Sequence, residues 1–200
     1  MSPRAPALPP DQRRAGIVRA ALGVLRERGQ AATTRELAEA AGVAEGTLFR
    51  VFRSKEDLVS AALEQAFDVA PLLAGLGEVD RSLGLRERLV EATTILQARY
   101  TEVFGLMEAM GMVHPPERPS GTADTATSVK DHDAWHRQVV DQLAAVVGAD
   151  AGQLRVPAEE LVELIRLLTF SGSHPVLTQG HILSPQTIVE VLLDGTRRAD

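Results

Sequence analysis

Apolar residues recur every three to four positions along nearly the whole chain, which is the spacing of amphipathic helices. No stretch alternates β-branched and polar residues between hairpin signals, as strands do. Glycine and proline interrupt the helical pattern at intervals and set the limits of the expected helices. The pattern therefore predicts an all-α fold.

The first four expected helices are closely spaced. The first runs from Asp11 to Arg28, with Ile17, Ala21, Val24 and Leu25 on one face and Gly29 as its stop. The next three are expected at 34–42, 45–52 and from 55 to about 76. Thr33 with Glu36, and Ser54 with Asp57, have the spacing of helix N-caps.

The remainder of the chain predicts longer helices separated by one clear loop. The segment 114–124 is rich in Pro, Gly, Ser and Thr and is expected to be that loop. The expected helices are 85–110, as one helix or two, then 128–147, 157–171 and 185–195.

Two short helices joined by three residues indicate a helix-turn-helix. Ala38 is small where the two helices must cross closely, and Gly42 follows the first helix where a left-handed backbone is needed. Val43 and Leu48 are apolar where the motif closes on its own core. The joint occurrence of these residues is more specific than any one of them.

The charge distribution is more informative than the net charge of −6, which alone argues against a nucleic-acid partner. Residues 1–60 have ten basic and seven acidic side chains, a net of +3, and the other 140 have 11 and 20, a net of −9. The N-terminal part is therefore the one expected to meet a polyanion, and the acidic part would repel it.

Cysteine is absent, so disulfides, thiolate metal sites and cysteine nucleophiles are excluded. The proline-rich segment 1–10 lacks the apolar run of a signal peptide and is expected to be a disordered tail. We expect a cytoplasmic protein without membrane contact or cofactor. Its predicted domains are a helix-turn-helix domain over 11–57 and a larger helical domain over 58–200.

The stretch TTRELAEAAGVAEGTLFRVFRSKEDL, Thr33–Leu58, resembles the tetracycline-repressor (TetR) family of bacterial transcription regulators. The resemblance implies an N-terminal three-helix DNA-binding domain and a helical ligand-binding and dimerisation domain. It implies a regulator that binds a palindromic double-stranded DNA operator as a homodimer and is released by a small-molecule effector. Repression is favoured, and activation stays open.

The resemblance also assigns DNA-contacting residues on two helices and the start of a third. Hydroxyls and cations bind phosphate, and arginine pairs with guanine in the major groove. The predicted contacts are Thr33, Thr34, Arg35, Glu45, Gly46, Thr47, Phe49, Arg50, Arg53 and Lys55. Relatives often have Ser where this chain has Ala44, so a helix cap is expected to be absent. They often have Tyr where it has Phe49, so a hydroxyl contact is also expected to be absent, and His or Tyr where it has Val51. Leu48 and Phe52 are expected to be core.

Effector-binding candidates come from side chains at helical spacing and from the aromatic and histidine residues of the second domain. They are Tyr100, Phe104, Met107, Glu108, Met110, Trp135, His136, Phe170 and His174. Ordinary core packing is the alternative for each. These residues favour an apolar effector with a cationic or hydrogen-bonding part that faces Glu108 or a histidine.

The last two expected helices have more apolar positions than one buried face requires. By the resemblance they pack against a second copy as a four-helix bundle. The expected interface residues are Leu161, Leu164, Ile165, Leu168, Ile188, Val189 and Leu192. A monomer that buries all of them internally is the alternative.

Two other functions stay open. One is a helical sensor or interaction module without specific DNA binding. The other is a metalloenzyme centred on His132 and His136, with His114, His174 or His181 as a further ligand. Asp133 is shorter than the Glu of the metalloprotease motif, and nucleophile, phosphate-loop and paired-carboxylate motifs are absent, so we expect neither an enzyme nor a metal.

Overall fold

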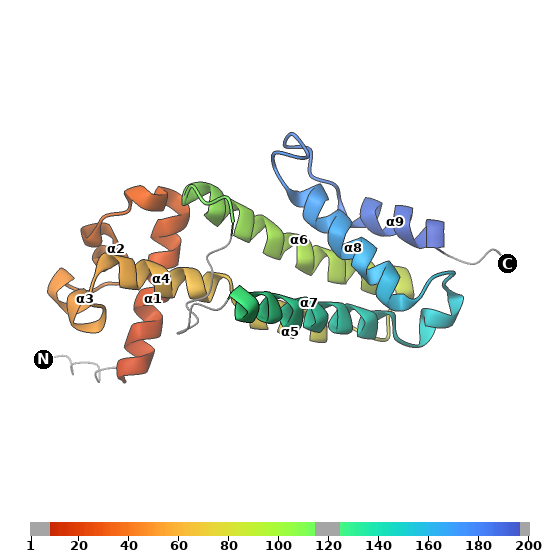
Figure 1. Ribbon diagram of the computed structural model, residues 1–200, viewed down its shortest axis with the longest axis horizontal. Coiled ribbons are helices and arrows are strands. Elements are labelled where there is room, and N and C mark those ends of the chain that lie inside the picture. Colours follow the sequence, from red (N-terminus) through yellow and green to blue (C-terminus); the bar gives the residue numbers. More distant parts are fainter. Residues whose placement is uncertain (1–8, 115–124, 197–200) are drawn as a thin grey trace, which may run out of the picture. The chain divides into compact units, whose positions relative to one another are not determined.

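The computed structural model describes the backbone of residues 9–114 and 125–196, and the side chains of residues 9–114 and 135–195. Helices form the regular structure of these residues, as the periodicity predicts (Figure 1). Residues 1–8 of the expected tail and 115–124 of the expected loop lie outside the described part of the chain.

The chain divides into two compact units. Among the described residues, the first comprises 9–68 and 105–114, and the second comprises 69–104 and 125–196. The expected domain boundary at residue 58 stays a prediction, but by packing the whole of α4 (Lys55–Ala66) belongs with the first unit.

Helices of 7 to 19 residues form most of the first unit. They are α1 (Pro10–Arg28), the 3-10 turn η1 (Gly29–Ala31), α2 (Thr34–Ala40), α3 (Glu45–Val51), α4 and the last turn of α6 (Leu85–Ala109). α1 packs against both α2 and α4. The largest fully buried side chains of the shared core are Ile17, Leu25, Leu37, Leu48, Leu58 and Leu106. The sequence predicted the N-terminal limits of these helices to within one residue.

A tight turn at Gly29 ends α1. Its φ of +54° lies in the region that favours glycine, as the stop signal predicts. A Cβ at this position would lie 1.8 Å from the backbone oxygen of Ala109, at the end of α6. The next residue, Gln30, donates from Nε2 to the carbonyl oxygen of Met110 at 2.5 Å. The turn before α2 is thus packed directly on the end of α6.

The prediction of one continuous helix from 55 to about 76 is wrong, because this stretch forms two helices. α4 ends at Ala66, and α5 begins at Ala70 and ends at Gly77. Pro71 in the first turn of α5 has no N–H to donate to the carbonyl of Phe67, and its ring would clash with that carbonyl in a continuous helix. The stretch Lys55–Gly77 is apolar enough to span a membrane by composition, but neither half has the roughly 20 residues that a spanning helix needs.

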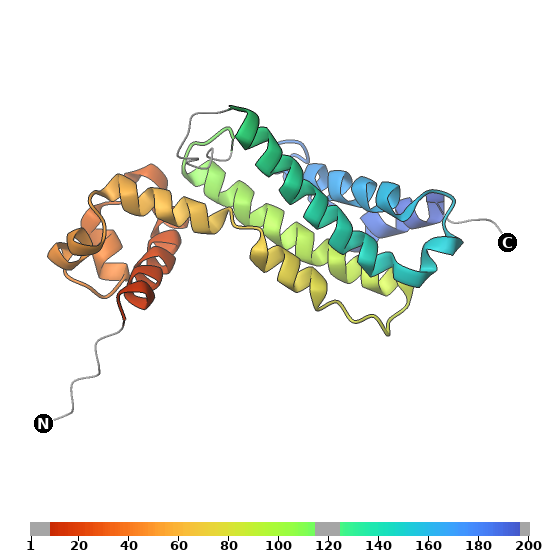
Figure 2. The same cartoon turned by 60° about the horizontal axis from the view of Figure 1, so that its bottom comes forward.

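The second unit contains the helices α7 (Thr125–Val147), α8 (Ala158–Ser173) and α9 (Pro185–Thr196), with α5, most of α6 and the 3-10 turn η2 (Gly148–Gln153). α8 packs against both α7 and α9 (Figure 2). The segment 85–109 is one helix. Fully buried core residues include Leu76, Leu89, Leu96, Leu143, Leu161 and Ile165.

A buried arginine closes the end of α7. Arg88 of α6 is 8% exposed, pairs with Asp150 of η2 and donates to the carbonyl oxygen of Val147 at 3.2 Å. Carbonyls in the last turn of a helix have no partner within the helix, so this guanidinium supplies a donor where one is needed.

Gly29→Ala should unfold the first unit readily. Alanine would have to adopt a backbone conformation that favours glycine, and its Cβ would clash with Ala109. We therefore expect the free energy of unfolding to fall by about 3 kcal/mol or more. Urea unfolding followed by circular dichroism measures it. Gly23→Ala is the matched control, because Gly23 lies inside α1 with open space around it, and it should gain about 0.5 to 1 kcal/mol. Equal effects of the two substitutions would contradict the role given to the Gly29 turn.

Candidate functional site

α2 and α3 form the helix-turn-helix that the sequence predicts. Gly42 has φ of +66°, and the Val43 N–H donates to the Ala38 carbonyl at 3.0 Å, which closes the end of α2. Ala38 and Leu48 are buried, and Val43 packs against the same core. Phe52 is 4% exposed, so its assignment to the core is confirmed along with that of Leu48.

The start of α2 is fixed by a complete capping box. The Thr33 N–H donates to Glu36 Oε2 at 2.8 Å, and the Glu36 N–H donates to Thr33 Oγ1 at 3.2 Å. Arg28, the last residue of α1, pairs with Glu36 at 3.1 Å. The bonds from Thr33, aided by Arg28, hold the pKa of Glu36 below its usual range. One carboxylate therefore joins α1 to the N-terminus of α2.

A hydrogen bond joins the N-termini of α2 and α3. Thr34 Oγ1 donates to Glu45 Oε1 at 3.0 Å, and both residues are among the predicted DNA contacts. Ala44, the N-cap of α3, offers no side-chain cap, as the sequence indicates. Glu45 thus places α3 against α2 where a capping side chain is missing.

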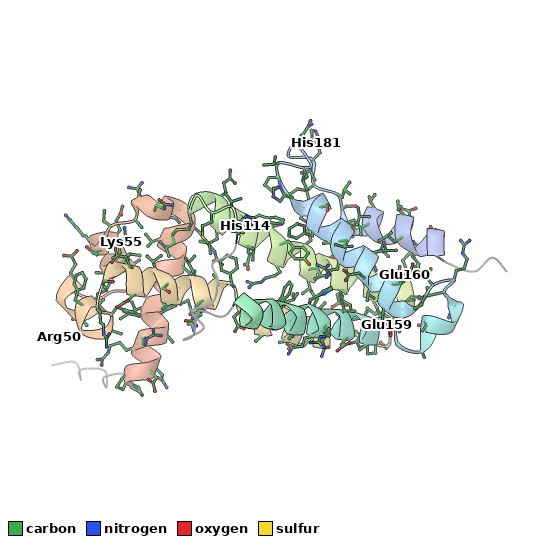
Figure 3. All side chains as sticks on the ribbon, viewed as in Figure 1. Arg50, Lys55, His114, Glu159, Glu160 and His181 are labelled. Carbon is green, nitrogen blue, oxygen red and sulfur yellow. The ribbon has the colours of Figure 1, made fainter. Side chains whose placement is uncertain are left out.

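Three arginines of the motif lie exposed: Arg35 on α2, Arg50 on α3 and Arg53 two residues after the end of α3. Within the described part of the chain they make no hydrogen bond or ion pair. Figure 3 shows Arg50 projecting away from the core. Phe49 is 47% exposed on α3, which is unusual for a side chain of this size. Exposed cations and an exposed ring suit a nucleic-acid surface.

The other predicted contacts surround the same helix starts. Thr33 and Gly46 are exposed, and Thr47 is half-buried. Lys55 begins α4 and donates weakly to the carbonyl oxygen of Gln30 at 3.4 Å, so its ammonium lies near the segment that precedes α2 (Figure 3). The predicted residues therefore come from α2, α3 and the start of α4 within one unit.

The predicted effector stripe on α6 is divided between the two units. Met107, Glu108 and Met110 fall in the first unit, where Met110 is buried in the core with Leu106. Tyr100 and Phe104 fall in the second. Helical spacing alone placed them on one stripe.

Four predicted residues do come together in the second unit. The ring of Phe104 lies 5.0 Å from Phe170 and 4.7 Å from His174, and Tyr100 lies 5.4 Å from Phe170, centroid to centroid. We call Tyr100, Phe104, Phe170 and His174 the aromatic cluster. It joins one face of α6 to the C-terminal end of α8.

Beside this cluster lies an ionic group that the sequence did not reveal. Arg166 donates to both carboxylate oxygens of Glu163, at 2.7 and 2.9 Å, and His136 Nε2 lies 2.9 Å from Glu163 Oε2. Trp135, next to His136 on α7, is half-buried against the core. The spacing of Glu163 and Arg166 on α8 was the available signal, but only the fold brings His136 to them.

These contacts shift two pKa values. Hydrogen bonds from Arg166, with a further one from His136, lower the pKa of Glu163 to about 2. Burial raises the pKa of Tyr100, and Arg166 acts in the opposite direction. At neutral pH the carboxylate is therefore charged and the phenol is neutral.

The expected dimer residues divide by burial. Leu161, Ile165, Ile188 and Val189 are buried inside the second unit. They cannot also cover a second copy, because their surface is already removed from water. Leu168 and Leu192 are half-buried, and Leu164 is 38% exposed. Leu167 and Val191, which the sequence did not select, are 47% and 63% exposed.

The described residues contain no group of three or more His, Asp or Glu side chains arranged to hold a metal ion. The side chain of His132, on which the metal hypothesis depends, lies outside them. His136 is bonded to Glu163, and His181 lies in the segment between α8 and α9 (Figure 3).

Comparison with known proteins identifies the N-terminal part most clearly. Residues 17–62 match the sequence model of a family described as bacterial regulatory proteins, tetR family. An uncharacterized HTH-type transcriptional regulator of Bacillus subtilis (strain 168), YvkB, is 48% identical over 50 residues. That match spans 24% of this chain and 26% of YvkB, about a quarter of either protein.

Solved structures resemble almost the whole chain in fold. A TetR transcriptional regulator from Streptomyces coelicolor is 22% identical, with 94% of this chain and 99% of that one covered and a TM-score of 0.54. The fatty acid degradation regulator FadR from Bacillus halodurans is 14% identical, with 96% and 95% covered and a TM-score of 0.56. A transcriptional regulator from Rhodococcus sp. is 22% identical, with 94% and 99% covered and a TM-score of 0.55.

Glu163→Gln should destabilise the protein in a pH-dependent way. Because folding lowers the pKa of this carboxyl from 4.5 to about 2, its stabilising effect is complete above pH 4.5 and is lost as the pH falls toward 2. We expect a loss of about 1 kcal/mol at pH 7, kept small by partial exposure. Urea titrations at pH 7, 5 and 3.5 should show that the difference in free energy of unfolding between the variant and the wild type narrows at the lowest pH. A difference that is the same at all three pH values would show that it does not come from the ion pair.

Proposed function

We propose that the chain is a TetR-family transcriptional regulator, a repressor that binds a palindromic operator as a homodimer through its helix-turn-helix and dissociates when a small-molecule effector binds. On this proposal it acts in the cytoplasm and catalyses no reaction. The observation that supports the DNA role is the group of unpartnered exposed arginines around α2 and α3.

The proposed interface has α3 in the major groove. Arg50 would then face base edges, while Thr33, Thr47, Arg53 and Lys55 would hold the phosphates on either side. Thr34 and Glu45 already share a hydrogen bond, so each contacts DNA only by giving up or sharing that bond. We therefore assign Glu45 first to positioning α3, and second to discrimination among bases.

The proposed dimer is formed by the exposed apolar side chains of α8 and α9. On these helices the exposed large apolar side chains are Leu164, Leu167, Phe170 and Val191, and Leu168 and Leu192 are partly covered. A second copy would remove them from water and set the two recognition helices about one DNA turn, roughly 34 to 36 Å, apart.

Effector response would follow from differential binding. A small molecule that binds more tightly to a conformation unable to span both half-sites lowers operator affinity by population shift. The aromatic cluster is the part of the second unit best suited to such a molecule. The expectation that a cationic or hydrogen-bonding part of the effector faces Glu108 or a histidine stays a prediction.

Arg50→Ala and Lys55→Ala should weaken DNA binding differently. Loss of Arg50 should cost about 1 to 3 kcal/mol on the preferred operator and relax base preference, whereas loss of Lys55 should weaken all sequences alike and reduce the salt dependence. The measurement is selection of an operator from genomic fragments that include the protein's own promoter, followed by fluorescence anisotropy at several salt concentrations.

Arg155→Ala is the control, because it removes the same charge from an exposed arginine of the second unit. It should leave operator affinity nearly unchanged. The DNA role fails if the wild-type protein gives no salt-sensitive, sequence-specific complex with any fragment.

Leu167→Glu should shift the dimer toward monomer. A carboxylate at the centre of an apolar interface loses hydration without gaining a partner, and we expect about 2 kcal/mol or more, roughly a thirtyfold weaker dimer. Sedimentation velocity at micromolar concentration measures it. Val113→Glu, at an 81% exposed position of the first unit, should leave the dimer intact. A monomeric wild-type protein would refute the proposed assembly.

A further inference from the structure

The longest run of the chain without a charged side chain extends from the second half of α8 into α9. Its 23 residues, 167–189, contain no Asp, Glu, Lys or Arg, although 24% of the whole chain is charged. Eight of the eleven exposed large apolar side chains among the described residues lie between 164 and 191. A surface that is depleted of charge and rich in apolar side chains is typical of the core of a protein interface.

Residues 174–184 of this charge-free segment form a turn between α8 and α9, which we call the arm. The Thr178 N–H donates to the His174 carbonyl at 3.0 Å, and the Gly180 N–H donates to the Pro175 carbonyl at the same distance. Figure 1 shows the arm extending beyond the two helices. Its backbone is therefore held in one shape by bonds within the turn.

The base of the arm is anchored to the second unit. The Leu183 N–H donates to the Gly172 carbonyl at 3.0 Å, and the Leu183 carbonyl accepts from Gln97 Nε2 of α6 at 2.6 Å. A Cβ on Gly172 would lie 3.0 Å from the Leu183 side chain, so glycine at this position lets the arm pack closely on α8. Figure 3 shows His181 at the far end.

The arm nevertheless leaves apolar side chains in water. Val176 is 76% exposed, Leu177 is 65% exposed and Ile182 is 49% exposed. Covering them would gain the free energy of apolar burial, and a preformed turn loses little conformational entropy when it binds. The arm therefore has the properties of a contact surface.

The lack of charge indicates a second copy of this chain as the partner. In a two-fold dimer the residues near the axis lie next to their own copies, so a charged side chain there would face a like charge. A charge-free segment avoids that repulsion. A nucleic acid or an anionic membrane would instead require Lys or Arg, which the segment lacks.

The area that a stable dimer needs also favours a second copy. The four exposed apolar side chains of α8 and α9 together expose about as much surface as two whole residues, which is roughly 400 Å² at about 200 Å² for each large side chain. A stable interface buries about 800 Å² on each partner. The four exposed apolar side chains of the arm, which include Leu183 at its base, expose slightly more than those of the helices. Together the two sets reach the required area.

We propose that the arm of each copy packs on the charge-free segment of the other copy, and that this contact covers Val176, Leu177 and Ile182. The faces of α8 and α9 without the arm bind a second copy only weakly. This inference rests on the proposed function, since it names the segment that completes the proposed homodimer.

The absence of cysteine allows a site-specific test in the full-length protein. Val176→Cys and Val113→Cys each introduce one thiol, at positions that are 76% and 81% exposed within one copy. The rate of labelling by a maleimide is measured for each variant in the native dimer and in concentrated urea. We expect the thiol at 176 to react at least tenfold more slowly in the dimer than in urea, and the thiol at 113 to react within about twofold of its rate in urea.

Leu177→Glu measures the contribution of the arm to assembly. Since Leu177 is exposed within one copy, the variant should keep its helical circular dichroism spectrum. We expect the dimer Kd from sedimentation equilibrium to rise at least tenfold. Val113→Glu is the matched control and should leave this Kd unchanged.

The proposal for the arm alone is overturned if the wild-type protein is a dimer but the thiol at 176 reacts as fast as in urea, or if Leu177→Glu dimerises with the wild-type Kd. The contact of α8 and α9 that Leu167→Glu tests can stand in either case. A wild-type protein that is monomeric at micromolar concentration overturns both the arm and the proposed homodimer. Operator binding is measured on the same preparation, and protection of the thiol at 176 without any operator complex supports the arm and refutes the DNA role.

Discussion

The starting point of α2 is the constraint on which the helix-turn-helix depends. Glu36 fixes it through contacts with two residues: it accepts hydrogen bonds from the Thr33 N–H and hydroxyl, and it pairs with Arg28 at the end of α1. α2 has seven residues. If it began one residue earlier or later, the turn of the helix per residue would rotate its apolar face away from the core. Thr34 then ties α3 to the same point through Glu45. The orientation of the proposed recognition helix is therefore set by side chains outside the core as much as by Leu37 and Leu48.

Local signals in the sequence predicted most of the first unit. Capping pairs, Gly29 and Gly42 each act within a few residues, so their effect is visible without the fold. The one clear error there, a continuous helix to residue 76, came from following apolar spacing past Pro71, whose missing N–H is also a local signal. The contact of Gly29 with Ala109 joins residues far apart in sequence, and no local pattern could reveal it.

The second unit was predicted less well, since its helices are apolar on more than one side. On α8 the pattern could not separate Leu161 and Ile165, which are buried, from Leu164 and Leu167, which face water. Nor could it show that Met110 packs in one unit and Phe104 in the other, because periodicity along α6 is the same for both. The Glu163, Arg166 and His136 group needed two helices to meet, and such pairings are a product of tertiary structure.

Phe49 has a thermodynamic consequence for the proposed interaction with DNA. An aromatic ring that is 47% exposed on α3 is hydrated in the free protein. If the operator covers it, water released from its apolar surface lowers the heat capacity of the complex, whereas contacts to phosphate by arginine and lysine add mainly a dependence on salt. The enthalpy of operator binding would then become more negative as temperature rises. A tyrosine at position 49 could donate its hydroxyl to a phosphate, whereas Phe49 cannot. On the proposed interface Phe49 therefore contributes apolar contact in place of that hydrogen bond.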